Sequence, residues 1–276
     1  MNTKKVVDHI TNWLAEYAEK SRVKGFVIGV SGGIDSAVTS ALCARTGKKT
    51  LVLEMPIHQA ASQVSRAQEH ITWLKQRHSL VWDERIELTS TFEEFKKSVK
   101  TDGDEAGVAL SLANTRARLR MTTLYYHAGL HHLLVAGTGN KVEDFGIGFF
   151  TKYGDGGVDL SPIADLKKTE VYQLAAELGI VESIMKAAPT DGLFGDNRSD
   201  EDQIGASYPE LEWAMDYLAN GELRIENGKW DDVLIDTLPL SDREKFVMKI
   251  YLQRNRANRH KMDPIPVCLI PGEMKS

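Results

Sequence analysis

Cysteine is scarce in this sequence, which has only Cys43 and Cys268 among its 276 residues. Two cysteines are too few for a disulfide framework or a zinc site, so both are interpreted as ordinary core or surface thiols. Cys43 falls in a predicted helix with no histidine partner suggested nearby, which also argues against a cysteine-based amidase.

Long apolar runs and an excess of positive charge are missing as well. No run approaches the roughly 20 residues of a membrane span, and the start is not followed by the apolar core of a signal peptide. The formal net charge is -5, which argues against general nucleic-acid binding, although a local basic patch remains open. We therefore predict a cytoplasmic protein with no membrane contact and no nucleic-acid partner.

The remaining composition is that of a globular protein, with 42% hydrophobic and 26% charged residues. A chain of 276 residues is long enough for one large α/β domain. Neither an internal repeat nor a linker divides the sequence, so we expect a single domain over residues 1–276.

The stretch from Phe26 to Ser36 organises the rest of the chain. Residues 26–30 are typical of a buried strand, Ser31-Gly32-Gly33 breaks it, and residues 37–44 have helical character. The loop therefore lies at a helix N-terminus, where free N–H groups and the helix dipole favour a phosphate. Glycine lets the backbone approach the phosphate closely, and the hydroxyls of Ser31 and Ser36 add donors.

Asp35 is the unexpected residue in this loop. A carboxylate facing a polyphosphate repels it unless a divalent cation lies between them, so Asp35 predicts Mg²⁺. The loop has no Gly-Lys-Ser/Thr and is not the common P-loop. A strand, turn and helix with an ordinary capping residue is the alternative for the Ser-Gly-Gly alone.

Strands and helices alternate along the chain, which predicts a doubly wound parallel sheet flanked by helices, followed by C-terminal helices. Further strands are expected at 50–56, at either 80–82 or 85–88, and at 132–136. Helices are expected at 5–20, 62–77, 92–99, 107–129, 166–178, 209–219 and 241–258, with capping boxes at Thr91 and Ser241. Gly179 is predicted to end its helix, and residues 189–202 are expected to form a loop.

The loop after the strand at 132–136 should lie at the same edge of the sheet as Asp35, where ligands bind. Glu143 follows this strand and could reach the same metal, and Thr138 could contact a nucleotide. The alternative is a plain turn with Asn140 capping the next helix. Lys168 lies in the first turn of a predicted helix, where the dipole disfavours a cation unless an anion is near. A solvated lysine remains the alternative there.

Two motifs resemble known families. Ser31-Gly32-Gly33-Ile34-Asp35-Ser36 resembles the pyrophosphate loop of the ATP pyrophosphatases. The block Phe149-Phe150-Thr151-Lys152-Tyr153-Gly154-Asp155-Gly156-Gly157 narrows the resemblance to the NAD synthetases. Membership implies an adenine nucleotide alpha hydrolase-like, Rossmann-like fold and a ligase. It also implies ATP-dependent amidation of deamido-NAD through an acyl-adenylate, giving NAD, AMP and pyrophosphate.

The resemblance also implies roles for residues. Asp35 and Glu143 would bind Mg²⁺ and, with Lys168, form the catalytic set. The ATP-binding positions would be Gly29, Val30, Ser31, Gly32, Gly33, Ile34, Asp35, Ser36, Thr138, Lys168 and Thr190. Deamido-NAD would contact Arg118, Lys152, Asp159, His260 and Lys261. Family members form homodimers with the dinucleotide near the interface, and the helix at 107–129 offers an apolar face for one.

Some of these assignments rest on the resemblance alone. Helical spacing cannot say whether Arg118 turns inward, and a helix C-terminus attracts cations such as His260 and Lys261 anyway. Lys152 and Asp159 could be simple exposed charges. Many ammonia-dependent members have Gly-Thr-Asp-His before the metal glutamate, whereas this sequence has Gly137-Thr138-Gly139-Asn140-Lys141. Residues 193–202 are assigned no role.

The expected nitrogen donor is free ammonia, because the chain has no room for the glutaminase domain of glutamine-using relatives. A separate glutaminase subunit could also supply it. The base that deprotonates ammonia is either Asp159 or solvent. Two other classes stay open: another ATP pyrophosphatase, such as a tRNA thiolase or a GMP synthetase core, and a non-catalytic nucleotide-binding module.

Overall fold

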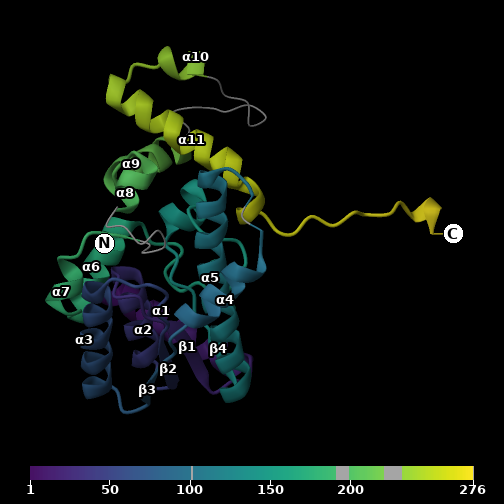
Figure 1. Cartoon of the computed structure of the whole chain (residues 1–276). Helices are drawn as coiled ribbons and strands as arrows, with labels where there is room; N and C mark the ends of the chain where they lie inside the picture. The colour runs from purple at the N-terminus through teal and green to yellow at the C-terminus, as the bar shows by residue number, and fades with distance from the viewer. Residues whose placement is uncertain (101, 191–198, 221–231, 276) are drawn as a thin grey trace.

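A parallel four-stranded sheet forms the centre of the computed structural model, with strand order β3-β2-β1-β4 (Figure 1). The strands are β1 (Gly25–Gly29), β2 (Lys49–Glu54), β3 (Val81–Arg85) and β4 (Leu133–Val135). Val27 of β1 is paired with Leu51 on one side and with Val135 on the other. The structure describes all residues except 101, 191–198, 221–231 and 276.

Alternating side chains of β1 build two hydrophobic cores, one on each face of the sheet. Phe26 and Ile28 pack with apolar side chains of α1 (Thr3–Lys20), α2 (Ile34–Arg45), α3 (Ala61–Arg77), α6 (Lys168–Leu178) and α7 (Glu182–Met185). Val27 instead packs with α4 (Thr89–Ser98) and α5 (Glu105–His131). Strand side chains alternate between faces, so a sheet covered on both sides reads as a continuous apolar run.

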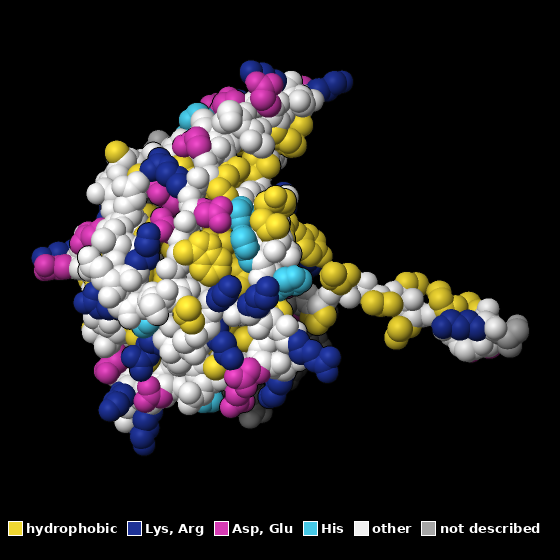
Figure 2. All heavy atoms as spheres, turned by 90° about the horizontal axis from the view of Figure 1, so that it is seen from below, with side chains coloured by type: hydrophobic (Ala, Val, Ile, Leu, Met, Phe, Trp, Pro, Cys, Tyr) yellow, Lys and Arg dark blue, Asp and Glu magenta, His cyan; other side chains and the backbone are white. Residues whose placement is uncertain are grey.

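A third core lies among helices beyond the sheet. It is formed by η1 (Val142–Ile147), α8 (Asp200–Ile204), α9 (Tyr208–Ala219), α10 (Asp232–Asp236) and α11 (Asp242–Met262). In Figure 1, α9, α10 and α11 lie at the opposite end of the molecule from the lower ends of the strands. Beyond α11 an extended tail projects from the body and ends in η3 (Gly272–Met274), with exposed apolar side chains along it (Figure 2).

The predicted fold class is confirmed, and most predicted elements are found within a few residues of their expected limits. The capping box at Ser241 is present, because its hydroxyl and the Glu244 carboxylate exchange hydrogen bonds with each other's backbone N–H. Gly179 ends α6 in the left-handed conformation at φ 69°. β3 overlaps both candidate strands, at 80–82 and at 85–88, instead of matching only one of them.

Two local predictions are wrong. Thr91 does not begin a helix, because α4 starts two residues earlier at Thr89 and has Leu88 at its N-cap. The expected loop at 189–202 ends in α8, which begins after Ser199 in a capping box with Asp202. Short motifs of this kind occur inside helices as well as at their ends, and packing decides which applies. Residues 191–198 of that loop lie outside the described part of the chain.

Among the described residues, no helix combines the length and apolar character that crossing a membrane requires. Lys and Arg side chains are interspersed with Asp and Glu on the face drawn in Figure 2, and they do not gather into one basic surface there.

Candidate active site

The loop from Ser31 to Ser36 joins β1 to α2 at the carboxyl end of the sheet. Gly33 is the N-cap of α2 and makes no side-chain capping bond. The Ser36 hydroxyl donates to the Gly33 carbonyl at 3.0 Å and lies 3.3 Å from the Ser31 hydroxyl. Gly32 has φ 83°, and a Cβ there would lie 2.5 Å from the Gln63 carbonyl oxygen. The loop thus needs glycine at this position, and it leaves the helix N-terminus open for an anion.

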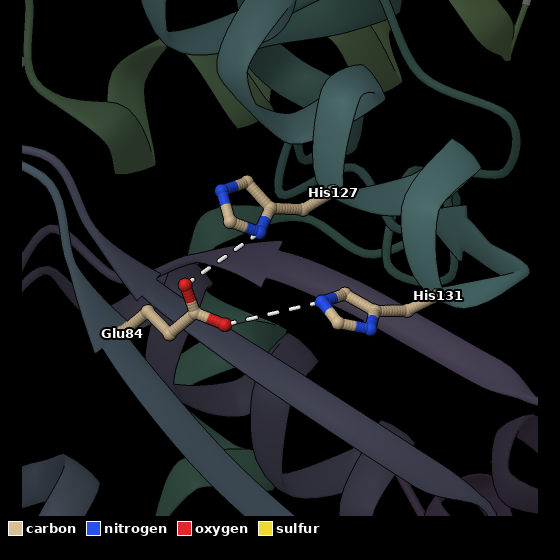
Figure 3. A group of neighbouring side chains, drawn as sticks. All are labelled: Glu84, His127 and His131. Atoms are coloured by element: carbon tan, nitrogen blue, oxygen red, sulfur yellow. Dashed lines mark ion pairs between the residues drawn. The ribbon is translucent and has the colours of Figure 1, made fainter.

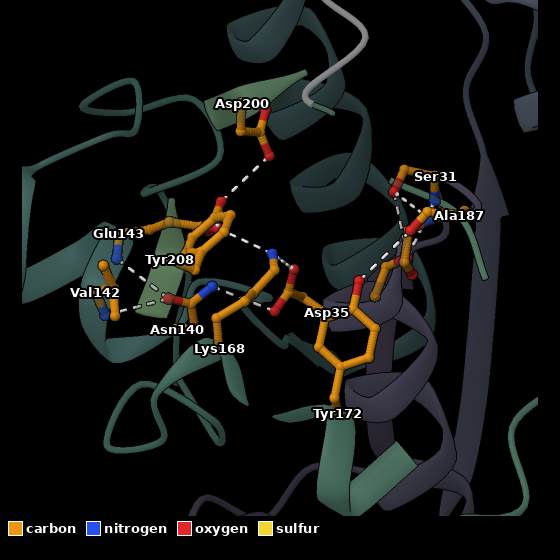
Figure 4. A network of polar contacts seen from close by, with 12 residues as sticks. Ser31, Asp35, Asn140, Val142, Glu143, Lys168, Tyr172, Ala187, Asp200 and Tyr208 are labelled. Atoms are coloured by element: carbon orange, nitrogen blue, oxygen red, sulfur yellow. Dashed lines mark hydrogen bonds and ion pairs between the residues drawn. The ribbon is translucent and has the colours of Figure 1, made fainter. Parts of the chain in front are cut away.

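Lys168 bridges the two acidic residues that were predicted as metal ligands. Its Nζ lies 2.5 Å from Oδ2 of Asp35 and 3.0 Å from Oε1 of Glu143 (Figure 4). Lys168 is the first residue of α6 and is only 3% exposed. The predicted conflict between its charge and the helix dipole is therefore resolved by two carboxylates.

These charges stabilise one another in a buried setting. Burial alone lowers the pKa of Lys168, but the charges of Asp35 and Glu143 outweigh it and raise that pKa above its ordinary value. Burial raises the pKa of Asp35, and the charge of Lys168 opposes that change. The lysine therefore stays protonated and supplies a fixed positive charge beside the loop that follows β1.

Asn140 and Tyr208 hold the two carboxylates in place. The Asn140 side chain accepts hydrogen bonds from the N–H groups of Val142 and Glu143, both at 3.1 Å, and donates to Oδ1 of Asp35 at 3.3 Å. Asn140 therefore caps η1, as the plain-turn alternative proposed, and contacts the acidic pair too. The Tyr208 hydroxyl lies 2.5 Å from Oε1 of Glu143. Burial and Glu143 raise the pKa of Tyr208, so its hydroxyl remains a donor.

Asp144 adds a third carboxylate near the pair. Burial raises the pKa of Asp144 to about 8, and the charges of Glu143, Asp155 and Asp35 add to that increase. A Cβ on Gly139 would lie 2.2 Å from both carboxylate oxygens of Asp144. Glycine at 139 thus makes room for this acidic side chain, which holds its proton more readily than an ordinary aspartate does.

A cavity of about 270 Å³ opens at this edge, and all of the predicted ATP-binding residues line it. All of Gly29 to Ser36 line it, together with Thr138, Glu143, Lys168 and Thr190. Residues of α5 also line the cavity. Among its arginines, Arg120 rather than Arg118 lines the cavity, and it donates to the Met55 carbonyl at 3.0 Å and to Gln59 at 2.9 Å.

The five residues predicted for deamido-NAD lie outside the lining of this cavity. Four of them form a connected group where the end of α11 meets the glycine-rich loop, which is the segment of residues 149–157. Arg118 donates to the Lys152 carbonyl at 3.3 Å, Lys152 to the His260 carbonyl at 2.6 Å, and Lys261 to the Phe150 carbonyl at 2.6 Å. Asp159 is separate and accepts bonds from the Tyr125 hydroxyl and the Val135 N–H.

Sequence reasoning missed several residues of this site. Tyr208 gave only a weak signal, because it follows Ser207 in a capping box at the start of α9. Asp144 stands beside Glu143 in the sequence, so its position near the acidic pair could have been predicted. Arg120 lies two residues after Arg118 in the same helix, and the side of α5 that faces the cavity depends on how the helix packs. Tyr172 and Asp200 also line the cavity.

Comparison with known proteins identifies the family. The model of the family described as NAD synthase matches residues 6–264. An NH(3)-dependent NAD(+) synthetase from Archaeoglobus fulgidus is 36% identical over 273 residues, covering 98% of both chains.

Solved structures agree. An NMN synthetase from Francisella tularensis superposes with a TM-score of 0.79 at 28% identity, covering 99% of both chains. An NH3-dependent NAD synthetase from Campylobacter jejuni gives 0.73 at 26% identity, covering 98% of this chain and 100% of that one. The predicted family is thereby confirmed: this chain belongs to the NAD synthase family, whose members are ligases that form a carbon–nitrogen bond.

Proposed function

We propose that the cavity beside Asp35, Glu143 and Lys168 is where ATP activates a nicotinate carboxylate for amidation. The reaction follows from the family: deamido-NAD, ATP and ammonia give NAD, AMP and pyrophosphate. The observation that carries the residue assignment is the position of Lys168. Its buried ammonium lies between two carboxylates, beside a helix N-terminus that no side chain caps.

The phosphates of ATP fit the loop from Gly29 to Ser36. Open N–H groups at the start of α2 and the Lys168 ammonium are preorganised donors for negative charge. Thr138 and Thr190 line the same cavity and are suited to contact the rest of the nucleotide. Such donors stabilise pyrophosphate most strongly as it leaves, which is when they accelerate the reaction.

The carboxylates of Asp35 and Glu143 fit Mg²⁺. They supply the hard oxygen ligands that this ion prefers, and ATP would complete the coordination. Asp35 and Glu143 face the single positive charge of Lys168, and the negative charge left over also favours a cation at this edge. Bound there, Mg²⁺ would neutralise phosphate charge. Asp35 and Glu143 are its proposed ligands, and Asn140 and Tyr208 orient them.

The chemistry then proceeds in two steps. An oxygen of the nicotinate carboxylate attacks the α-phosphorus of ATP, which forms an acyl-adenylate and releases pyrophosphate. Ammonia next attacks the acyl carbon and displaces AMP. Asp159 is already held by Tyr125 and Val135 and does not line the cavity, which favours solvent as the acceptor of the ammonia proton.

Free ammonia is the proposed nitrogen donor. Cys43 is fully buried, and burial raises the pKa of its thiol, so it stays protonated and cannot act as a glutaminase nucleophile. Rates with ammonium and with glutamine on the purified chain test this proposal. A preference of the isolated chain for glutamine would contradict it, whereas glutamine use only after adding a second subunit would identify a separate glutaminase.

A second candidate function differs from the first only in the size of its substrate. The Francisella tularensis structure with the TM-score of 0.79 is described as an NMN synthetase, and nicotinate amidation would be the same chemistry on a mononucleotide. The experiment is to incubate the protein with ATP, Mg²⁺ and ammonium plus either deamido-NAD or the deamidated mononucleotide. Equimolar AMP and amide should form, and the ratio of kcat/KM for the two substrates decides between them.

The group of Arg118, Lys152, His260 and Lys261 supports the larger substrate. These four residues are linked by hydrogen bonds at the loop of residues 149–157, and Arg118, Lys152 and Lys261 offer positive charge to a second phosphate and nucleoside. Arg118→Gln should therefore raise KM for deamido-NAD while leaving KM for ATP unchanged. Equal effects on both values would contradict the assignment.

We also propose a homodimer of single-domain, cytoplasmic subunits that pairs through α5. Tyr126 and Leu130 lie four residues apart on α5 and are 65% and 58% exposed. Such apolar exposure on one helix face is typical of an interface. Sedimentation of the wild type and of Leu130→Glu tests this: the wild type should sediment as a dimer and the variant as a monomer. A monomeric wild type would contradict the proposal.

A further inference from the structure

Two histidines and a glutamate meet between the edge strand β3 and the end of α5 (Figure 3). Nδ1 of His127 lies 3.7 Å from one carboxylate oxygen of Glu84, and Nε2 of His131 lies 3.9 Å from the other. The three ligand atoms all fall within 4.8 Å of one another. His127 and His131 are four residues apart and thus share one face of the helix.

His127 is the buried member of the cluster. It is only 7% exposed, and its Nδ1 has no hydrogen-bond partner among the described residues. The 3.7 Å to Glu84 is too long for a hydrogen bond. A buried polar atom without a partner is costly. In Figure 3 this nitrogen points at the Glu84 carboxylate, so the unsatisfied atom faces the centre of the cluster.

The donor set selects a particular class of ion. Imidazole nitrogen with one carboxylate suits Zn²⁺ and similar transition metals, whereas Mg²⁺ prefers oxygen ligands. Bonds of about 2.0–2.2 Å at tetrahedral angles place ligand atoms about 3.3–3.6 Å apart. Glu84 and His131 are partly exposed, at 40% and 34% of their side chains. Their side chains can therefore move the ligand atoms to the spacing that a bound ion requires, and water can fill the fourth coordination position.

We propose that Glu84, His127 and His131 form a Zn²⁺-type metal site that fastens the edge strand β3 to α5. None of the three lines the cavity at the phosphate loop. The site is thus separate from the one proposed for Mg²⁺ at Asp35 and Glu143. Its effect would be structural, because α5 carries the cavity-lining Arg120 and the metal would hold the far end of that helix against the sheet.

The test is Zn²⁺ binding by full-length protein without an affinity tag. Cys268 is an exposed thiol and is replaced by serine in every sample, and Mg²⁺ is kept in excess to occupy the acidic pair. A chromophoric chelator competes for Zn²⁺ and reports affinity and stoichiometry. Visible absorption of Co²⁺ in place of Zn²⁺ reports nitrogen and oxygen ligands. Far-ultraviolet circular dichroism of each variant checks folding.

The variants are His131→Gln and Glu84→Gln, which change partly exposed side chains, with His132→Asn as the control. His132 is the exposed neighbour that ends α5 at φ 59°, and asparagine tolerates this conformation. The control should bind one Zn²⁺ per chain and gain thermal stability from it. Each ligand variant should lose roughly 10-fold to 100-fold or more in affinity, since even supporting residues contribute that much.

Three results would overturn the proposal. The first is the absence of Zn²⁺ binding by the Cys268→Ser protein in which Glu84, His127 and His131 are all intact. The second is unchanged Zn²⁺ affinity in both folded ligand variants. The third is a Co²⁺ spectrum that does not change between the His132→Asn control and His131→Gln.

Discussion

The Lys168 ammonium lies 2.5 Å from the Asp35 carboxylate, although 133 residues separate them in the sequence. It also contacts Glu143 at 3.0 Å, so one buried cation serves two partly buried anions. Removing one partner of such a group leaves uncompensated charge, which is more costly than never having had the pair.

We therefore predict that Lys168→Met lowers the free energy of unfolding by about 3–5 kcal/mol in the absence of divalent ions. Mg²⁺ should restore part of the loss, because it can neutralise Asp35 and Glu143 in place of the ammonium. Urea unfolding with and without Mg²⁺ measures both effects. Lys167→Met is the control: its partner Asp216 is half exposed, so the expected change is within about 1 kcal/mol. Equal losses in both variants would contradict the central role of Lys168.

Asp35→Asn should abolish most pyrophosphate release while the protein stays folded. The amide keeps the shape of the carboxylate but loses the charge needed to hold a cation near the phosphates. We expect a fall in rate of roughly 100-fold or more, typical of a lost electrostatic contact in the transition state. The release of pyrophosphate and circular dichroism are the measurements. Asp165→Asn, which changes a 97% exposed side chain, should keep full activity. Wild-type activity in Asp35→Asn would refute the metal assignment.

Gly32→Ala tests the phosphate loop through its backbone. Alanine at φ 83° is strained, and its Cβ would approach the Gln63 carbonyl oxygen to 2.5 Å. Gly47→Ala is the matched control. Gly47 has φ 68° and open space around a Cβ, so alanine there adds backbone strain without a steric clash. That strain costs about 1–2 kcal/mol. Gly32→Ala should lose more stability than the control and raise KM for ATP. Identical behaviour of the two variants in thermal unfolding and ATP titration would contradict the close packing of the loop.

His70 should make the protein less stable at acidic pH. This histidine is fully buried, its Nε2 lies 2.9 Å from the Ser40 hydroxyl, and burial lowers its pKa from 6.5 to about 4. Between these values the unfolded chain binds a proton that the folded chain does not. Stability is therefore lost as pH falls from 6.5 towards 4, by up to about 1.4 kcal/mol per pH unit.

His70→Phe removes the titrating group and keeps a ring to stack on Trp73. Urea unfolding across this pH range should show a shallower pH dependence in this variant than in the wild type. The exposed His9, changed to glutamine, serves as the control and should leave the dependence as it is. Parallel curves for His70→Phe and the wild type would show that His70 does not cause the acid sensitivity.

Much of the fold could be predicted from local patterns. The apolar strand at Phe26, the breaker at Gly32 and Gly33, and the stop at Gly179 act within a few residues, so they can be read directly. The expectation that Asp35 and Glu143 share one edge also held, because the carboxyl ends of parallel strands meet there. The capping motif at Thr91 failed because α4 already begins at Thr89, so Thr91 lies inside its first turn, next to Phe92, which packs in the core on that face of the sheet.

The sequence by itself determined the glycine-containing turn after the first strand, the acidic residues near it and the family. Only the tertiary structure decided which side chains face one another across long separations. The direction of a side chain on a helix depends on how that helix is rotated against its neighbours. For that reason Arg120 rather than Arg118 lines the cavity, Tyr208 reaches Glu143 from another layer, and Glu84 meets two histidines of α5.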